Sequence, residues 1–127
     1  MTDPKDLSVP ELLDKMMGLE FYLVHNELLG APADLGPHLK DHLLYMIGLE
    51  KQGVLFASGP LFDKDDQMTG EGVTIIRAAS FQAAEAIAAQ DPFVIAGLRR
   101  SHVSKWRVNE GRISLEVDLS DGVVRVG

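Results

Sequence analysis

The sequence predicts an α+β fold built in the order strand, helix, strand, strand, helix, strand. Segments rich in aromatic and β-branched residues predict the strands. Between them lie segments whose apolar residues recur every three or four positions, as they do on one face of a helix. Glycine and proline stand at most of the boundaries. We therefore expect one antiparallel sheet with both helices on one of its faces.

The composition is that of an ordinary globular protein, and we expect residues 1–127 to form a single domain. A formal charge of −7 and a pI near 4.9 argue against nucleic acid or an anionic membrane as a partner. The absence of cysteine excludes disulfides and thiolate metal sites. No secretory signal and no apolar run of membrane-spanning length is present, so we expect a cytoplasmic protein.

The chain is expected to begin with a helix over residues 8–18. Ser8 is suited to cap its start, Glu11 completes a capping box, and Pro10 falls in the first turn, where its missing N–H costs little. Gly18 is expected to end it. The helix has an apolar side, which we expect to pack against another surface.

The first half of the predicted sheet follows. A strand is expected over residues 19–28, then a Gly/Pro-rich loop over residues 30–37. The next helix is expected from Pro37 to Gln52, ended by Gly53. A short central strand, Val54–Ser58, should then be ended by Gly59 and Pro60.

An acidic loop over residues 62–72 is expected to lead into the strand Val73–Ala79. Ser80 should cap a helix over residues 81–90. Asp91 and Pro92 then start a short turn, and the strand Ser101–Val108 follows. The last segment, residues 112–127, is expected to form a hairpin around Asp121 and Gly122.

This order of elements is that of a ferredoxin-like (βαββαβ) domain, with a core over about residues 19–110. The predicted N-terminal helix and C-terminal hairpin lie outside that core. A sheet with helices on one face leaves the other face open, and a second copy of the chain is the simplest cover for it. We expect a homodimer or a higher homo-oligomer.

His42 is the most conspicuous candidate site residue. It lies at the edge of the apolar face formed by Leu39, Leu43 and Met46. An imidazole facing a core must find hydrogen-bond partners, so His42 is either a structural histidine or part of a site. Asp91 likewise has two interpretations, because an Asp before Pro is well suited to cap a helical turn. A carboxylate held in this way can also orient a histidine.

Two segments resemble the YCII-related family. The first is HLLYMIGLEKQGVLFASGPL, from His42 to Leu61, and the second is S-x-x-x-A-x-x-x-x-x-x-DPF, from Ser80 to Phe93. The resemblance covers roughly residues 19–110 and implies a dimeric α+β barrel, in which two ferredoxin-like sheets pack together. It also implies a His–Asp catalytic pair, which falls here on His42 and Asp91.

The resemblance implies work on small organic molecules, since some relatives remove chloride from chlorinated hydroxyquinols and muconolactone isomerases share the wider fold. We therefore expect a cofactor-independent enzyme of the lyase or isomerase type. The alternative is a noncatalytic protein that holds a small ligand in the same pocket. A third possibility is a structural oligomer whose polar pair only stabilises the core.

The remaining candidates are weaker. Ser58, Gly59 and Pro60 close a strand and are candidates for substrate binding, together with Phe93, which is otherwise a core residue. His38 has the four-residue spacing to His42 that suits a metal, and His25 is a conceivable third ligand, but we expect no metal site. Arg99 and Arg100 either attract an anionic substrate or form a surface pair, and the surface pair is the interpretation we prefer.

Overall fold

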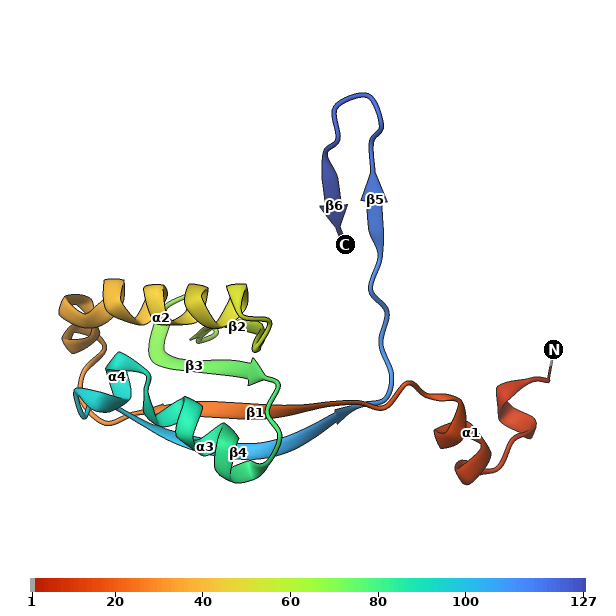
Figure 1. Ribbon diagram of the computed structural model, residues 1–127, viewed down its shortest axis with the longest axis horizontal. Helices are drawn as coiled ribbons and strands as arrows, with labels where there is room; N and C mark the ends of the chain where they lie inside the picture. The colour runs from red at the N-terminus through yellow and green to blue at the C-terminus, as the bar shows by residue number, and fades with distance from the viewer. Residues whose placement is uncertain (1) are drawn as a thin grey trace. The chain divides into compact units, whose positions relative to one another are not determined.

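A computed structural model describes residues 2–127 and divides them into two compact units. One unit spans Glu20–Arg107, and the other combines the residues before Glu20 with those from Val108 onward. The first unit contains the four-stranded sheet (Figure 1). No helix among residues 2–127 is long and apolar enough to cross a lipid bilayer.

The sheet has four strands in the order β2-β3-β1-β4, which is the ferredoxin-like arrangement. The strands are β1 (Leu19–Leu28), β2 (Leu55–Phe62), β3 (Met68–Ile76) and β4 (Arg99–Val108). β3 pairs antiparallel with both β1 and β2. The predicted α+β fold is therefore confirmed.

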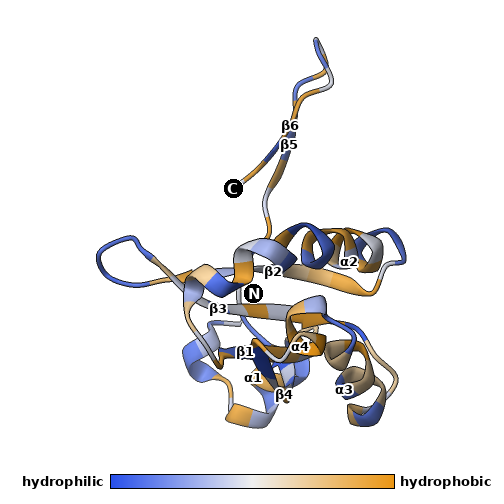
Figure 2. Ribbon diagram, turned by 90° about the vertical axis from the view of Figure 1, so that its left-hand side faces the viewer, coloured by the Kyte–Doolittle hydropathy of each residue, from blue (hydrophilic) through white to orange (hydrophobic). Residues whose placement is uncertain are grey.

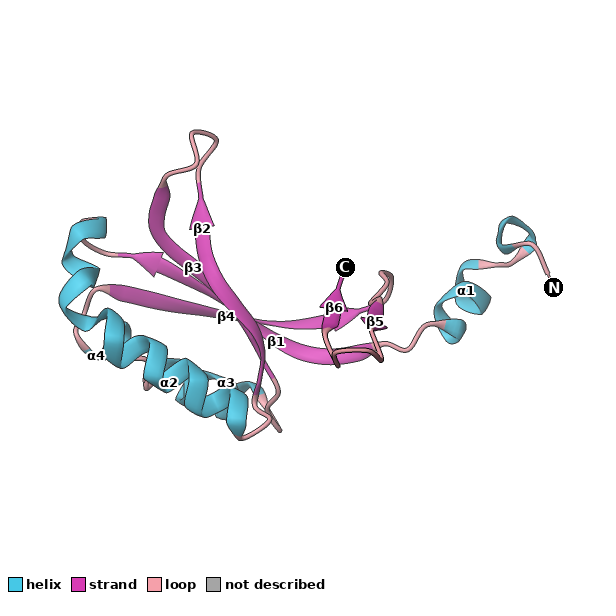
Figure 3. Ribbon diagram, turned by 90° about the horizontal axis from the view of Figure 1, so that it is seen from above, coloured by secondary structure: helices cyan, strands magenta, loops and turns pink. Residues whose placement is uncertain are grey.

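Three helices lie together on one side of this sheet (Figure 3). They are α2 (Leu39–Lys51), α3 (Phe81–Ala89) and the single turn α4 (Pro92–Ile95). The core beneath them joins alternate residues of the central strands to the small side chains of α3, and its buried members are Tyr22, Val24, Ile76, Ala84 and Ala88. Alanines at these positions let α3 lie close to the sheet.

The expected helix starts are confirmed where a local side chain sets them. Ser80 Oγ accepts from Ala83 N at 3.1 Å and begins α3. Gly53, with a φ of +75°, follows the end of α2 as expected. α2 itself starts two residues later than expected, because Pro32–His38 form a 3₁₀ helix (η2) before it.

The expectation that Gly59 and Pro60 end a central strand is wrong. β2 continues through both residues to Phe62, and it lies at the edge of the sheet. An edge strand tolerates proline because one of its sides needs no N–H donors, and β2 accommodates Pro60 with an irregularity before Phe62. The acidic loop is also shorter than expected, because β3 starts at Met68.

The other unit holds the elements outside the predicted ferredoxin-like core. Helix α1 (Val9–Lys15) starts at Ser8 with the expected capping box, but it ends before Gly18, and none of its residues is buried. A short 3₁₀ helix, Pro4–Asp6 (η1), precedes it. Strands β5 (Leu115–Val117) and β6 (Val124–Val126) form the expected hairpin around Gly122, which has a φ of +71°.

The two faces of the sheet differ in what covers them. Tyr22 and Val24 point to the helices, so the alternating residues Phe21, Leu23 and His25 point to the opposite side. We call this side the open face. Figure 2 shows that α2, on the covered side, mixes hydrophobic and hydrophilic positions. Met46 and Leu49 are buried there, whereas several other apolar residues of α2 are exposed.

Candidate functional site

Asp91 lies between α3 and α4, where it caps the start of α4. Its Oδ1 accepts a hydrogen bond from Phe93 N at 3.0 Å, and Pro92 occupies the first helical position. The residue is only 2% exposed. A local turn therefore fixes the direction of a buried carboxylate, as the Asp-Pro pair predicts.

His42, in the first turns of α2, reaches the same carboxylate. Its Nδ1 lies 2.8 Å from Asp91 Oδ1, and its side chain is 14% exposed. Because an ionised carboxylate only accepts hydrogen bonds, we assign the proton of the imidazole to Nδ1. The imidazole Nε2 is then the nitrogen that remains to accept or donate a proton. The two residues are 49 positions apart in the sequence, and the fold brings them into contact.

Phe93 holds the histidine ring from a second direction. The rings of Phe93 and His42 stack with centroids 4.3 Å apart and planes 18° apart. Phe93 is 2% exposed, so its position is set by the core. His42 is thus held by a hydrogen bond at one edge and by an aromatic face.

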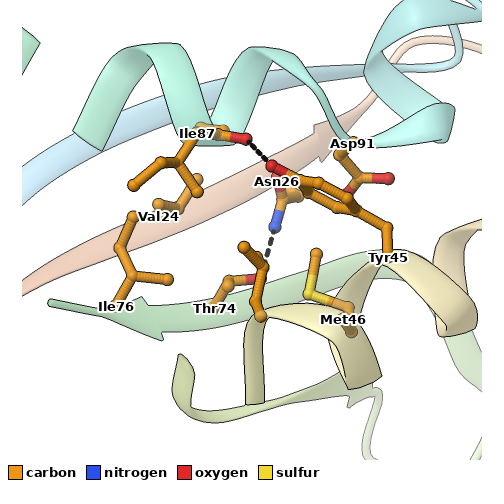
Figure 4. A pocket seen from close by; sticks show the side chains of 10 residues that line it. Val24, Asn26, Tyr45, Met46, Thr74, Ile76, Ile87 and Asp91 are labelled. Atoms are coloured by element: carbon orange, nitrogen blue, oxygen red, sulfur yellow. Dashed lines mark hydrogen bonds between the residues drawn. The ribbon is translucent and has the colours of Figure 1, made fainter. Parts of the chain in front are cut away.

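The second oxygen of Asp91 has no partner. Asp91 Oδ2 is buried and makes no hydrogen bond within the part of the chain that the structure describes. Asp91 also lines a cavity of about 10 Å³, together with Asn26, Tyr45 and Thr74 (Figure 4). A cavity of this size has room for about one water molecule, and not for an organic substrate.

Tyr45 connects α2 to α3 above this cavity. Its hydroxyl donates to Ile87 O at 2.7 Å. Burial, with a contribution from the negative charge of Asp91, raises the pKa of Tyr45 above its ordinary value. The phenol therefore stays protonated and keeps the two helices joined beside the His42–Asp91 pair.

Arg99 is buried, which the sequence analysis did not foresee. It is 7% exposed, whereas Arg100 is exposed and pairs with Glu27 at 3.6 Å. The preferred interpretation of a surface pair is therefore wrong for Arg99. Its Nε donates to Gly70 O at 3.0 Å, and its guanidinium carbon lies 4.6 Å from the centre of the Phe93 ring. From the sequence alone, a charged residue is expected to be exposed to solvent. The burial of Arg99 is known only from its packing in the folded chain.

The segment Ser58–Pro60 belongs to strand β2. All three residues are exposed on the edge strand β2, where Ser58 pairs with Thr74. Ser58 lines a groove with Leu43, Met46 and Ile47. Among residues 2–127, no hydrogen bond joins this segment to His42 or Asp91.

The other histidines do not join His42. His38 precedes α2, and His25 points to the open face, where it bonds Glu71 Oε1 at 3.1 Å. His102 stacks on His25 with ring centroids 6.0 Å apart and bonds Glu27. The described residues contain no group of three or more His, Cys, Asp or Glu side chains placed to hold a metal ion.

Comparison with known proteins assigns a family to the segment that forms the four-stranded sheet and its helices. The model of the YCII-related domain matches residues 22–107. Among curated proteins, none matches this sequence.

Two solved structures resemble the chain. One is 5-chloro-2-hydroxyhydroquinone dehydrochlorinase (TftG) from Burkholderia phenoliruptrix AC1100, in complex with 2,5-dihydroxybenzoquinone. It has 23% identity and a TM-score of 0.56 over 69% of this chain and 93% of its own, and it shares the fold. The other is SnoaB, a cofactor-independent oxygenase from Streptomyces nogalater, with 16% identity and a TM-score of 0.43 over 72% of this chain and 94% of its own.

Proposed function

Because this chain belongs to the YCII-related domain family, we propose that it is a small-molecule enzyme of the lyase or isomerase type. In this proposal His42 is the general acid and base, and Asp91 is the positioning residue that orients it. The observation that carries the proposal is the 2.8 Å hydrogen bond from His42 Nδ1 to the buried Asp91 Oδ1. Such a bond selects one tautomer and stabilises the imidazolium that forms when the ring takes a proton.

The reaction begins with proton transfer to His42 Nε2. The imidazole takes a proton from a carbon or hydroxyl of the substrate, and the bonding electrons stay on the substrate. In an isomerisation, the same proton returns to a different atom. In an elimination, those electrons form a double bond and a leaving group departs with its own electron pair. Neither sequence of steps needs a redox cofactor, and the proposal includes none.

We further propose that the working form is a homodimer. The open face is rich in apolar side chains: the ring of Phe21 lies 4.6 Å from that of Phe56, tilted by 38°, and 6.3 Å from that of Trp106. Phe56 and Trp106 remain 44% and 39% exposed in the single chain. A second sheet packed on this face would cover them.

The choice of first substrates follows from the similar solved structure. A dehydrochlorinase that shares the fold binds 2,5-dihydroxybenzoquinone. Hydroxylated aromatic compounds, their chlorinated forms and the lactones derived from them are therefore the panel with which the search for turnover should start.

The test is a turnover assay on this panel with two variants. We expect His42→Gln to lower kcat by roughly 100-fold or more, because it removes the proton acceptor. Asp91→Asn should lower kcat through loss of orientation, with a smaller effect on KM. His102→Gln, at an exposed histidine of β4, is the matched control and should retain activity.

Two results would count against this assignment. Full activity in His42→Gln would exclude the histidine from the chemistry. Tight binding of a panel compound without any turnover would favour the noncatalytic ligand-binding alternative.

A further inference from the structure

We propose that Arg99 forms an anion-binding subsite next to His42, and that the substrate is a small organic anion that presents a carboxylate or an acidic enolic oxygen to it. This inference rests on the proposed function and names the substrate class of the same site. Four properties of Arg99 carry it: its burial, its unoccupied donors, its position and the shape of the backbone beneath it.

Arg99 is buried without an ionic partner. None of the ion pairs that join residues 2–127 includes it, although only 7% of the residue is exposed. Buried arginines are ordinarily paired, since an uncompensated charge away from water is costly. Its one hydrogen bond in this part of the chain uses Nε, which donates to Gly70 O. Nη1 and Nη2 therefore remain available for an external acceptor.

The charge on Arg99 persists despite the burial. Burial lowers the pKa of Arg99 below its ordinary value, while the negative charges of Asp91 and Glu71 act in the opposite direction. An arginine starts so far above neutral pH that it remains protonated. The guanidinium is a planar fork of donors, which matches the two oxygens of a carboxylate.

The position of Arg99 connects it to the His42–Asp91 pair. The guanidinium carbon lies 4.6 Å from the centre of the Phe93 ring, and the His42 ring stacks on Phe93 at 4.3 Å. One phenyl ring therefore contacts both groups. In the proposed subsite, a substrate that engages Arg99 through its anionic end presents another of its atoms to the imidazole of His42.

The glycines of β3 make room for the guanidinium. A Cβ on Gly72 would lie 3.5 Å from Arg99 Nη1 and 3.6 Å from Nη2, and only 3.0 Å from Gly59 O. Arg99 extends from the edge strand β4 to this backbone, crossing β1. The Gly70-Glu71-Gly72 segment lacks the sequence context of a phosphate-binding motif. In the structure its backbone lies against the guanidinium of Arg99.

The chemistry explains what a cation contributes here. When a base removes a proton from a carbon beside a carbonyl or carboxylate, negative charge develops on the oxygen. A fixed positive group near that oxygen stabilises the transition state in a site shielded from water. The protein as a whole carries a net charge of −7, so recognition of an anion needs a local cation of this kind.

The test compares matched anionic and neutral probes by NMR titration of the full-length protein. The probes are 2,5-dihydroxybenzoate against 2,5-dihydroxybenzamide, with 2,5-dihydroxybenzoquinone, which ionises at neutral pH, as a second anion. We expect both anions to bind at least about tenfold more tightly than the amide, because charge-assisted hydrogen bonds supply that difference. Their addition should shift the signals of His42 and Phe93.

The variants are Arg99→Lys, Arg99→Gln and the control Arg100→Gln. Arg99→Gln should abolish the preference for anions, and Arg99→Lys, which keeps the charge and guards against loss of folding, should keep only part of it. Arg100→Gln, at the exposed neighbour, should behave like the native protein. The inference is wrong if neither anion binds more tightly than the amide, or if the preference survives in Arg99→Gln.

The outcome separates this inference from the proposed enzyme activity. Anion binding that depends on Arg99 and persists in His42→Gln, with no turnover of any panel compound, would support the subsite and count against catalysis. Turnover that depends on His42 but is indifferent to substitution of Arg99 would support catalysis and overturn the subsite.

Discussion

Glu71 ties β3 to β1 through both of its carboxylate oxygens. Oε2 accepts from Leu28 N at 2.8 Å, and Oε1 lies 3.1 Å from His25 Nε2. The hydrogen bond from Leu28 N, followed by that from His25, lowers the pKa of Glu71 below its ordinary value. Both contacts favour the charged form, so the carboxylate is more stable in the folded chain than in the unfolded one.

This difference predicts a pH dependence of stability. A carboxylate with a lowered pKa stabilises the fold above the pKa of its unfolded form, and the contribution disappears as the pH falls through the folded value. Glu71→Gln should therefore make the loss of stability less steep on acidification from about pH 7 to about pH 3. Thermal unfolding across this range measures it, with Glu85→Gln, at an exposed position of α3, as the control. Equal slopes for the native protein and Glu71→Gln would refute the prediction.

At the same scale, the sequence identifies His42 and Asp91 as separate candidates, but it does not predict the contact between them. The apolar periodicity marks His42, and the Asp-Pro pair marks Asp91, because both signals are local. Their contact depends on how α2 packs over α4, which no spacing along the chain determines. Arg99 shows the opposite case, since nothing local distinguishes it from Arg100. Burial decides its role, and burial is a property of the folded sheet.

At the scale of elements, the predictable boundaries are those that a local side chain or glycine sets. Ser8 and Ser80 cap α1 and α3 through their own side chains, so the starts of these two helices are predictable from the local sequence. The end of β2 is not, because a Gly-Pro pair stops a central strand and is tolerated at an edge. Whether a strand lies at the edge depends on the order of the whole sheet.

Helix α2, which carries His42, is only partly predicted by local sequence signals. α2 is predicted from its apolar face and from Gly53, but its apolar residues are divided between a buried side and an exposed side. Leu43, Leu44 and Ile47 are 48%, 57% and 50% exposed, so periodicity overestimates how many of them enter the core of one chain.

At the scale of the whole molecule, the ferredoxin-like unit leaves one sheet face open. Leu23 lies in the middle of this face, opposite Ile75 on the neighbouring strand. The sequence indicates such a face through its alternating strands, and it cannot show what covers the face. The single-domain organisation of residues 1–127 likewise stays a prediction, since the elements outside the family core form a compact unit of their own.

The proposed dimer predicts the effect of a charge at the centre of the open face. Leu23→Lys should convert the native dimer to a monomer, because two buried ammonium groups would face each other without partners. Light scattering coupled to size-exclusion chromatography measures the mass. Leu44→Lys introduces the same charge on α2 and should leave the dimer intact. A native monomer, or a dimer that withstands Leu23→Lys, would exclude this interface.

The most direct test of the account is the protonation of the two ring nitrogens of His42, read from their ¹⁵N chemical shifts at a pH where the ring is neutral. The hydrogen bond to Asp91 Oδ1 predicts a proton on Nδ1 and a bare Nε2 ready to accept one from a substrate. Asp91→Asn should weaken this preference. A native protein with its proton on Nε2 and a bare Nδ1 would contradict the orienting role of Asp91 and the mechanism built on it.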